Sequence, residues 1–154
     1  MTQPKFVPKP GQTDYTDIRY APTVNIVVVY GRKILCVQRA VDLRLYPGQW
    51  DWVCGFLDDD QSIEEKAYEE LREELGLRPE DVESLTRGQV RIDEAPEYGK
   101  TWLIVPLLAK VKTDTFTLDW EASRGRWFSP EELKTLDLVP NSLPTAAQFF
   151  PELI

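Results

Sequence analysis

The chain has 154 residues, a formal net charge of −8 and no histidine. This length suits one domain with a hydrophobic core. A composition of 42% hydrophobic and 29% charged residues is that of a folded protein rather than a disordered one. The absence of histidine excludes catalytic triads with an imidazole base and zinc sites built on histidine. The acidic balance argues against a nucleic-acid partner, because clustered lysine and arginine bind phosphate backbones.

The cysteines and the amino terminus predict a cytoplasmic location. Cys36 and Cys54 lie far apart in apolar runs, which indicates neither a redox pair nor a disulfide. Residues 1–17 lack the apolar core of a signal peptide, and no run approaches the roughly 20 apolar residues of a membrane span. We therefore expect a cytoplasmic protein with no membrane partner.

Residues 1–22 form a proline-rich arm, in which the density of proline and glycine excludes a helix. The runs TVNIVVVY and KILCVQR follow, and their β-branched residues predict a hairpin that turns at Gly31. We see no internal repeat and no linker after the arm. Residues 23–154 are therefore expected to form one domain.

A strand, a loop and a helix are predicted next. The run DWVCGFL predicts a strand that ends at Gly55, and an acidic loop follows. Ser62 is the expected N-cap, with Glu65 completing a capping box, and Gly76 ends the helix. One apolar stripe of this helix is expected to pack on the sheet: Ile63, Ala67, Leu71 and Leu75.

The remaining third of the chain has a mixed pattern. The runs GQVRIDE and KTWLIVPLLAKV predict strands on either side of a loop at residues 94–100. The runs TFTLDWE and GRWF and the helix start SPEEL complete the pattern. The tail from about Asn141 is expected to form a last short helix.

Three carboxylates share one face of the predicted helix. At about 100° per residue, Glu70 and Glu74 lie about 40° apart and Glu70 and Glu73 about 60° apart. Like charges at this spacing repel each other. A solvated acidic face is one interpretation. The other is a site for Mg²⁺ or Mn²⁺, which prefer carboxylate oxygens.

Residues 55–77 resemble the Nudix box, the signature of the Nudix hydrolases. In that motif a glycine is followed after five residues by Glu, and after seven more by Arg-Glu-U-x-Glu-Glu-x-Gly-U, where U is a bulky aliphatic residue. Matching positions here are Gly55, Glu70-Leu71, Glu73-Glu74 and Gly76-Leu77. The resemblance covers most of residues 23–140. It implies an α/β/α sandwich with a mixed sheet between helices.

Two positions depart from the motif. Gln61 stands where the family has Glu, and Glu69 stands where it has Arg. The resemblance implies that this arginine orients the metal-binding acids. We hypothesise that a hydrogen bond between Gln61 and Glu69, or support from Lys66 or Arg72, replaces it.

The resemblance implies hydrolysis of a nucleoside diphosphate linked to another moiety, with Mg²⁺ as cofactor and Mn²⁺ as a substitute. The implied metal ligands are three side chains and one backbone carbonyl: Glu70, Glu73, Glu74 and the carbonyl of Cys54. Such an ion also accounts for an acidic protein that binds an anion. Since many relatives are dimers, a homodimer is a further expectation.

The general base and the substrate contacts are less specified. Without histidine the base is a carboxylate: either a box acid or Glu121, with Glu94 and Glu97 as weaker candidates. Arg39 and Arg44 are candidates for phosphate contact. Aromatic candidates for stacking, each also compatible with a core position, are Trp52, Trp50, Tyr46, Tyr98 and Trp102.

Two other functions remain open. Gln61 and Glu69 favour a catalytically weak nucleotide-binding module on the same fold. An isomerase acting on a prenyl diphosphate would need metal-binding histidines, so the lack of histidine argues against it.

Overall fold

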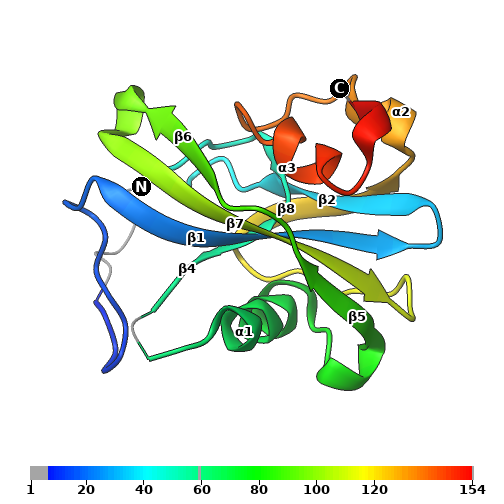
Figure 1. Cartoon of the computed structure of the whole chain (residues 1–154), viewed down its shortest axis with the longest axis horizontal. Helices are drawn as coiled ribbons and strands as arrows, with labels where there is room; N and C mark the ends of the chain where they lie inside the picture. The colour runs from blue at the N-terminus through cyan, green and yellow to red at the C-terminus, as the bar shows by residue number, and fades with distance from the viewer. Residues whose placement is uncertain (1–6, 59, 154) are drawn as a thin grey trace.

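Eight strands form one sheet with helices on both of its faces in a computed structural model, which describes residues 7–58 and 60–153 (Figure 1). Pro4 of the predicted arm and Asp59 of the predicted acidic loop lie outside the described residues. The strands are β1 (Tyr20–Tyr30), β2 (Lys33–Arg39), β3 (Trp50–Asp51), β4 (Val53–Phe56), β5 (Val82–Arg87), β6 (Arg91–Ala95), β7 (Lys100–Val111) and β8 (Ala122–Phe128). The helices are α1 (Ile63–Leu75), α2 (Pro130–Leu133) and α3 (Leu143–Ala147), with 3-10 turns η1 (Pro79–Asp81), η2 (Pro96–Tyr98) and η3 (Pro151–Leu153).

The neighbours of β1 organise the sheet. On one side β1 runs parallel to β7, and on the other it pairs with β4 through Thr23 to Ile26 and with β2 through Val28 to Tyr30. Strand β3 pairs with β2, whereas β4 pairs with β1. The pairing partner therefore changes from β2 to β1 at Trp52, between the two strands. The single strand predicted from DWVCGFL is therefore two short strands.

The two faces of the sheet carry separate apolar cores, as the predicted sandwich requires. Helix α1 packs Ala67, Leu71 and Leu75 against residues of β1 and β7 on one face. On the other face Trp50 and Trp52 pack with the segments that hold α2 and α3. The predicted α/β/α architecture is thus confirmed (Figure 1).

Most of the predicted elements are present. The hairpin turns at Gly31, and α1 begins after Ser62 with its capping box formed and ends at Gly76 in the left-handed conformation. The short helices after Ser129 and Ser142 are also present. The arm is shorter than predicted, because β1 already begins at Tyr20.

Two segments differ from expectation. Strand β5 was not predicted, since the run VESLTR buries only Val82. The TFTLDWE run, residues 115–121, forms no strand. Its Thr117 N–H instead donates to the carbonyl of Leu75 at 2.8 Å, at the end of α1, and Phe116 packs against the core beneath that helix.

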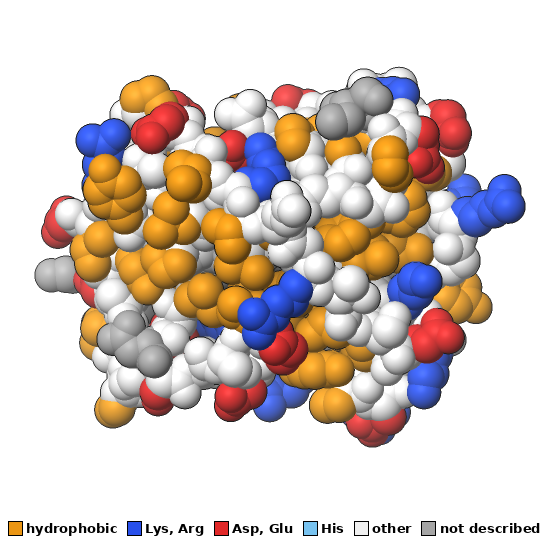
Figure 2. All heavy atoms as spheres, in the orientation of Figure 1, with side chains coloured by type: hydrophobic (Ala, Val, Ile, Leu, Met, Phe, Trp, Pro, Cys, Tyr) orange, Lys and Arg blue, Asp and Glu red, His pale blue; other side chains and the backbone are white. Residues whose placement is uncertain are grey.

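Hydrophobic side chains form a broad band across the face shown in Figure 2, which β1, β6 and β7 cross in Figure 1. Exposed hydrophobic residues of β1, of β6 and of the loop before β6 include Tyr20, Ile92 and Val90. None of the helices in the described part of the chain has the length and apolar character needed to cross a membrane.

Candidate active site

Helix α1 turns Glu70 and Glu74 towards the sheet. Both residues are only 7% exposed, whereas Glu73 on the same helix is exposed. Glu70 lies against Gly55 of β4 so closely that a Cβ atom at position 55 would overlap the Glu70 carboxylate. The first glycine of the motif is therefore explained by the close approach of an acidic side chain.

The buried acids form one electrostatic cluster. Burial raises the pKa of Glu74 well above its ordinary value, and the nearby Glu70 and Glu121 raise it further. Burial also raises the pKa of Glu70, although Lys66 opposes this. For Glu121, burial together with Asp119 and Glu70 raises the pKa to about 7. Helix α1 and the segment before β8 thus bring their acids to one place.

The acidic side chains are of the kind that binds a divalent cation, but those in the described residues do not yet converge on one point. Oε2 of Glu74 is buried and has no hydrogen-bond partner within residues 7–58 and 60–153. Over the same residues, no three acidic, cysteine or histidine side chains converge enough to hold a metal ion. A buried carboxylate oxygen without a partner nevertheless fits a hard divalent cation, which binds oxygen ligands.

The two residues that depart from the motif contact each other. Gln61 Nε2 donates to Glu69 Oε2 at 2.9 Å, as hypothesised. Nζ of Lys66 lies 3.3 Å from the same Glu69 oxygen and 3.2 Å from Glu70 Oε1. Arg72 is exposed and lowers the pKa of Glu69 through its charge, after Gln61 and Lys66, so Lys66 is the cation that contacts this part of the helix directly.

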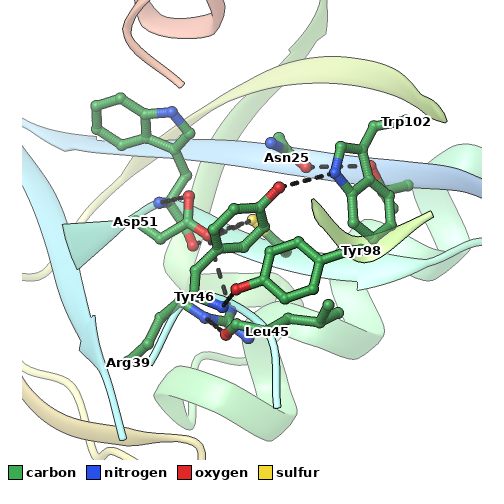
Figure 3. A network of polar contacts seen from close by, with 10 residues as sticks. Asn25, Arg39, Leu45, Tyr46, Asp51, Tyr98 and Trp102 are labelled. Atoms are coloured by element: carbon green, nitrogen blue, oxygen red, sulfur yellow. Dashed lines mark hydrogen bonds and ion pairs between the residues drawn. The ribbon is translucent and has the colours of Figure 1, made fainter. Parts of the chain in front are cut away.

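Arg39 of β2 and Asp51 of β3 lie close to each other (Figure 3). Arg39 Nη1 is 3.7 Å from Asp51 Oδ2, and Arg39 Nε donates to the carbonyl of Leu45 at 2.8 Å. Burial raises the pKa of Asp51, while Arg39 opposes that rise. Arg39 also lowers the pKa of Glu121, which places it within electrostatic reach of the acid cluster.

An aromatic group holds the loop between β2 and β3 (Figure 3). Tyr46 has φ 47°, a left-handed conformation that is uncommon for a bulky residue. Its N–H donates to Tyr98 Oη at 2.9 Å, and its own Oη accepts from Trp102 Nε1 at 3.0 Å. Such strain persists only where the surroundings enforce it. These contacts fix the loop that follows Arg39.

The other predicted site residues are placed differently. The substrate contact predicted for Trp52 is wrong, because this residue is 1% exposed in the core and its indole donates to the carbonyl of Ser142 at 3.0 Å. Arg44 is exposed, and its charge lowers the pKa of Lys100, which does not belong to the acid cluster. Cys54 lies nearer to the acid cluster. Burial is the main cause that raises the pKa of its thiol, and the charges of Asp51 and Glu74 raise it further.

The weaker candidates for the base also lie elsewhere. Glu94 forms an ion pair with Arg19 and accepts from Thr101 Oγ1, and Glu97 is exposed near Tyr46. Glu121 alone among the three later-loop candidates raises the pKa of a box acid through its charge. Its predicted role as base remains a prediction.

Sequence reasoning missed Asp51 and Asp119 as members of the site. An available indication was the run QWDWVCGF, in which Asp51 is an acid within an otherwise largely apolar strand. Asp119 had no such indication, because its proximity to Glu74 depends on the irregular path of residues 115–121.

Comparison with known proteins assigns the family. The family model of the NUDIX domain matches residues 19–152, nearly the whole chain. The chain belongs to the Nudix family. An RNA pyrophosphohydrolase of Shewanella frigidimarina is 57% identical over 37 residues, which are 24% of this chain. The match spans only 22% of that relative's length.

Solved structures share the Nudix fold. The NUDIX domain of Shewanella oneidensis NrtR, complexed with ADP ribose, superposes with a TM-score of 0.74 at 18% identity, covering 94% of this chain and 96% of that one. An Ap4A hydrolase of C. elegans has a TM-score of 0.68 at 20% identity, covering 86% and 97%. At these identities the comparison shows the fold alone.

Proposed function

We propose that this Nudix protein hydrolyses the pyrophosphate bond of a nucleoside diphosphate linked to another moiety, with Mg²⁺ or Mn²⁺ as cofactor. The observation that carries the proposal is the buried pair Glu70 and Glu74 behind Gly55, with one Glu74 oxygen lacking a partner in the described structure. Relatives named as an RNA pyrophosphohydrolase and an Ap4A hydrolase support the same class of reaction.

The groups that would hold the ion are the three box acids and the carbonyl just before the box: Glu70, Glu73, Glu74 and Cys54. When bound, the ion supplies positive charge to the pyrophosphate and acts as a Lewis acid. Glu73 is exposed at the edge of the cluster, and it lies close enough to raise the pKa of both Glu70 and Glu121.

In this proposal the protein's own groups carry the proton and the substrate charge. Glu121 accepts the proton of the attacking water, and a pKa of about 7 suits a general base near neutral pH. Arg39, at the end of β2, pairs with a phosphate oxygen. Its ion pair with Asp51 is long, at 3.7 Å, so the guanidinium retains donors for a ligand.

Location and assembly complete the proposal. Both cysteines are free thiols, Cys36 buried and Cys54 half-buried, which agrees with a reducing cytoplasm. A homodimer is proposed from the family resemblance, and light scattering of the purified protein tests it.

A substrate panel tests the proposed reaction. Nucleotide sugars, ADP-ribose, nucleoside triphosphates and dinucleotide polyphosphates are incubated with the protein and Mg²⁺, then with Mn²⁺, and phosphate or nucleotide release is measured. We expect turnover of at least one class, abolished by EDTA. No turnover of any of them by protein that binds the metal would contradict the proposal.

The second candidate function is nucleotide binding without turnover. It is favoured by Gln61 and Glu69, where the motif has Glu and Arg, and by the lack of three converging ligands in the described residues. The same panel distinguishes the two, because a binding module shifts the melting temperature with nucleotide but releases no product.

A further inference from the structure

We propose that Lys66 positions Glu70 for the divalent cation, and so replaces the arginine that the Nudix motif carries at position 69. This inference rests on the proposed function, since it assigns a positioning residue to the same site. It concerns a position that the motif leaves unspecified.

Lys66 is a buried cation that joins three carboxylates. It is 5% exposed, and its Nζ lies 3.2 Å from Asp58 Oδ2, 3.3 Å from Glu69 Oε2 and 3.2 Å from Glu70 Oε1. Glu69 and Glu70 are three and four residues further along α1, a spacing that places their side chains beside Lys66. Asp58 comes from the loop between β4 and α1.

The charges require such a cation. Asp58, Glu69 and Glu70 are three acids in little-exposed positions, and their mutual repulsion is offset by one lysine. Removing one partner from a buried ion group is costly, because it leaves the other charges uncompensated. The ion group also ties the loop of Asp58 to α1.

The contact between Lys66 and Glu70 restricts the orientation of the Glu70 carboxylate. Lys66 holds Oε1 of Glu70, while the Glu70 carboxylate lies against Gly55 of β4. Both contacts involve the same oxygen, because Oε1 is also among the Glu70 atoms that a Cβ at position 55 would overlap. A carboxylate fixed at Oε1 by the lysine and by the close approach of β4 has little freedom to turn, and in this proposal its Oε2 is the ligand of the cation.

The substitutions in the motif agree with this exchange of charges. Glu69 is negative where the motif is positive, and Gln61 is neutral where the motif is negative. Gln61 donates to Glu69 at 2.9 Å and so directs the Glu69 carboxylate, which also contacts Lys66. The positive charge therefore enters the same group of side chains from position 66, one turn earlier in the helix.

The affinity for Mn²⁺, measured by titration calorimetry alongside the melting temperature, tests this role without any substrate. Lys66→Met removes the charge but keeps most of the chain length, Lys66→Arg keeps the charge, and Arg72→Met is the matched control on the same helix. We expect Lys66→Met to weaken Mn²⁺ binding by about 10- to 100-fold. Lys66→Arg and Arg72→Met should bind Mn²⁺ as the wild type does.

Restoring the motif provides a second test. In the triple variant Lys66→Met with Gln61→Glu and Glu69→Arg, the acid and arginine of the motif return, and Mn²⁺ affinity should recover towards the wild-type value. This variant and Lys66→Arg keep the proposal testable if Lys66→Met alone does not fold. A triple variant that folds and binds Mn²⁺ no better than Lys66→Met would contradict the exchange of roles.

Three further results would overturn the inference. Unchanged Mn²⁺ affinity in Lys66→Met with a lower melting temperature would mean a merely structural ion group. Tighter Mn²⁺ binding in the same variant would mean that Lys66 competes with the metal. A wild-type protein that binds no Mn²⁺ would overturn the metal-dependent function and this role together, which distinguishes that failure from the other two.

Discussion

Glu70 and Glu74 lie in an environment that disfavours the charged form of their carboxyl groups. Burial raises the pKa of both, and each lies close to further acids. Groups with such perturbed pKa values cluster at functional sites. The acid face was predicted from spacing alone, but its burial was not, because burial depends on how α1 packs against β4.

Substitution of Gly55 tests the close packing of this site, because alanine adds a single Cβ atom. In Gly55→Ala the new Cβ overlaps the Glu70 carboxylate, so we expect a loss of about 1–3 kcal/mol in the free energy of unfolding and weaker Mn²⁺ binding. Urea denaturation and calorimetry measure the two effects. Gly31→Ala is the control: position 31 is open but has φ +60°, so only stability should fall, by about 1 kcal/mol. Unaltered Mn²⁺ affinity in Gly55→Ala would contradict the close contact.

Glu121 is the predicted base, and its removal should affect the rate more than the metal. We expect Glu121→Gln to lower kcat by about 10²- to 10⁴-fold, while its Kd for Mn²⁺ stays near the wild-type value. Glu94→Gln is the matched control, since Glu94 pairs with Arg19 outside the acid cluster. If kcat of Glu121→Gln equals that of the wild type, the base is another group.

Trp52 shows why residue type alone does not identify a ligand contact. An aromatic residue in a strand lies on one of two faces, and the sequence does not say which face is covered. Trp52 falls on the face covered by the segments of α2 and α3. Lys66 and Arg72 were the two basic residues suggested as supports, and Lys66 is the one that contacts Asp58, Glu69 and Glu70 directly, which depends on the position of the loop that carries Asp58.

At the scale of secondary structure, local patterns predicted α1 and missed β5. The capping box of Ser62 and the left-handed Gly76 depend on residues close in sequence, which is why the helix ends were correctly predicted. Strand β5 is formed because β7 offers it an edge, and residues 115–121 are held by the end of α1. Both depend on distant parts of the chain, so no local pattern indicates them.

The N-cap of α1 allows a prediction about the stability of this helix. Ser62 Oγ accepts from Glu65 N–H at 3.1 Å, so Ser62→Ala should lower the free energy of unfolding by about 1 kcal/mol. Ser142→Ala is the matched comparison, because the buried Ser142 hydroxyl has no partner among the described residues. Its removal should be neutral or stabilising. Equal losses in both variants, measured by urea denaturation, would argue against the cap.

At the scale of the whole molecule, the net charge of −8 is partly concentrated at one place between α1 and the sheet. In the proposed function a divalent cation at this place reverses the sign of the local charge, and so would allow an acidic protein to hold a pyrophosphate. The shared fold of Nudix structures below 25% identity shows that this arrangement of sheet and helix is the general feature. The departures at Gln61 and Glu69 are local to it.

The buried acids predict the pH dependence of stability in the metal-free protein. Their pKa values are raised on folding, from 4.5 to about 7 for Glu121. Between these values the folded state binds more protons than the unfolded state, so stability should fall as pH rises from about 4.5 through about 7. Urea denaturation in EDTA at several pH values measures this fall, and saturating Mg²⁺ should reduce it. A metal-free stability that rises over this range would contradict the raised pKa values.

The most direct test of the proposed site is the Mg²⁺-dependent hydrolysis rate of Glu74→Gln on the best substrate of the panel. Since Glu74 supplies the buried oxygen without a partner in the described structure, we predict a loss of at least about 100-fold with the fold intact. Glu64→Gln, on the exposed side of α1 beside Arg87, should keep the wild-type rate. A Glu74→Gln protein that hydrolyses substrate as fast as the wild type would show that the Nudix box is not the catalytic centre.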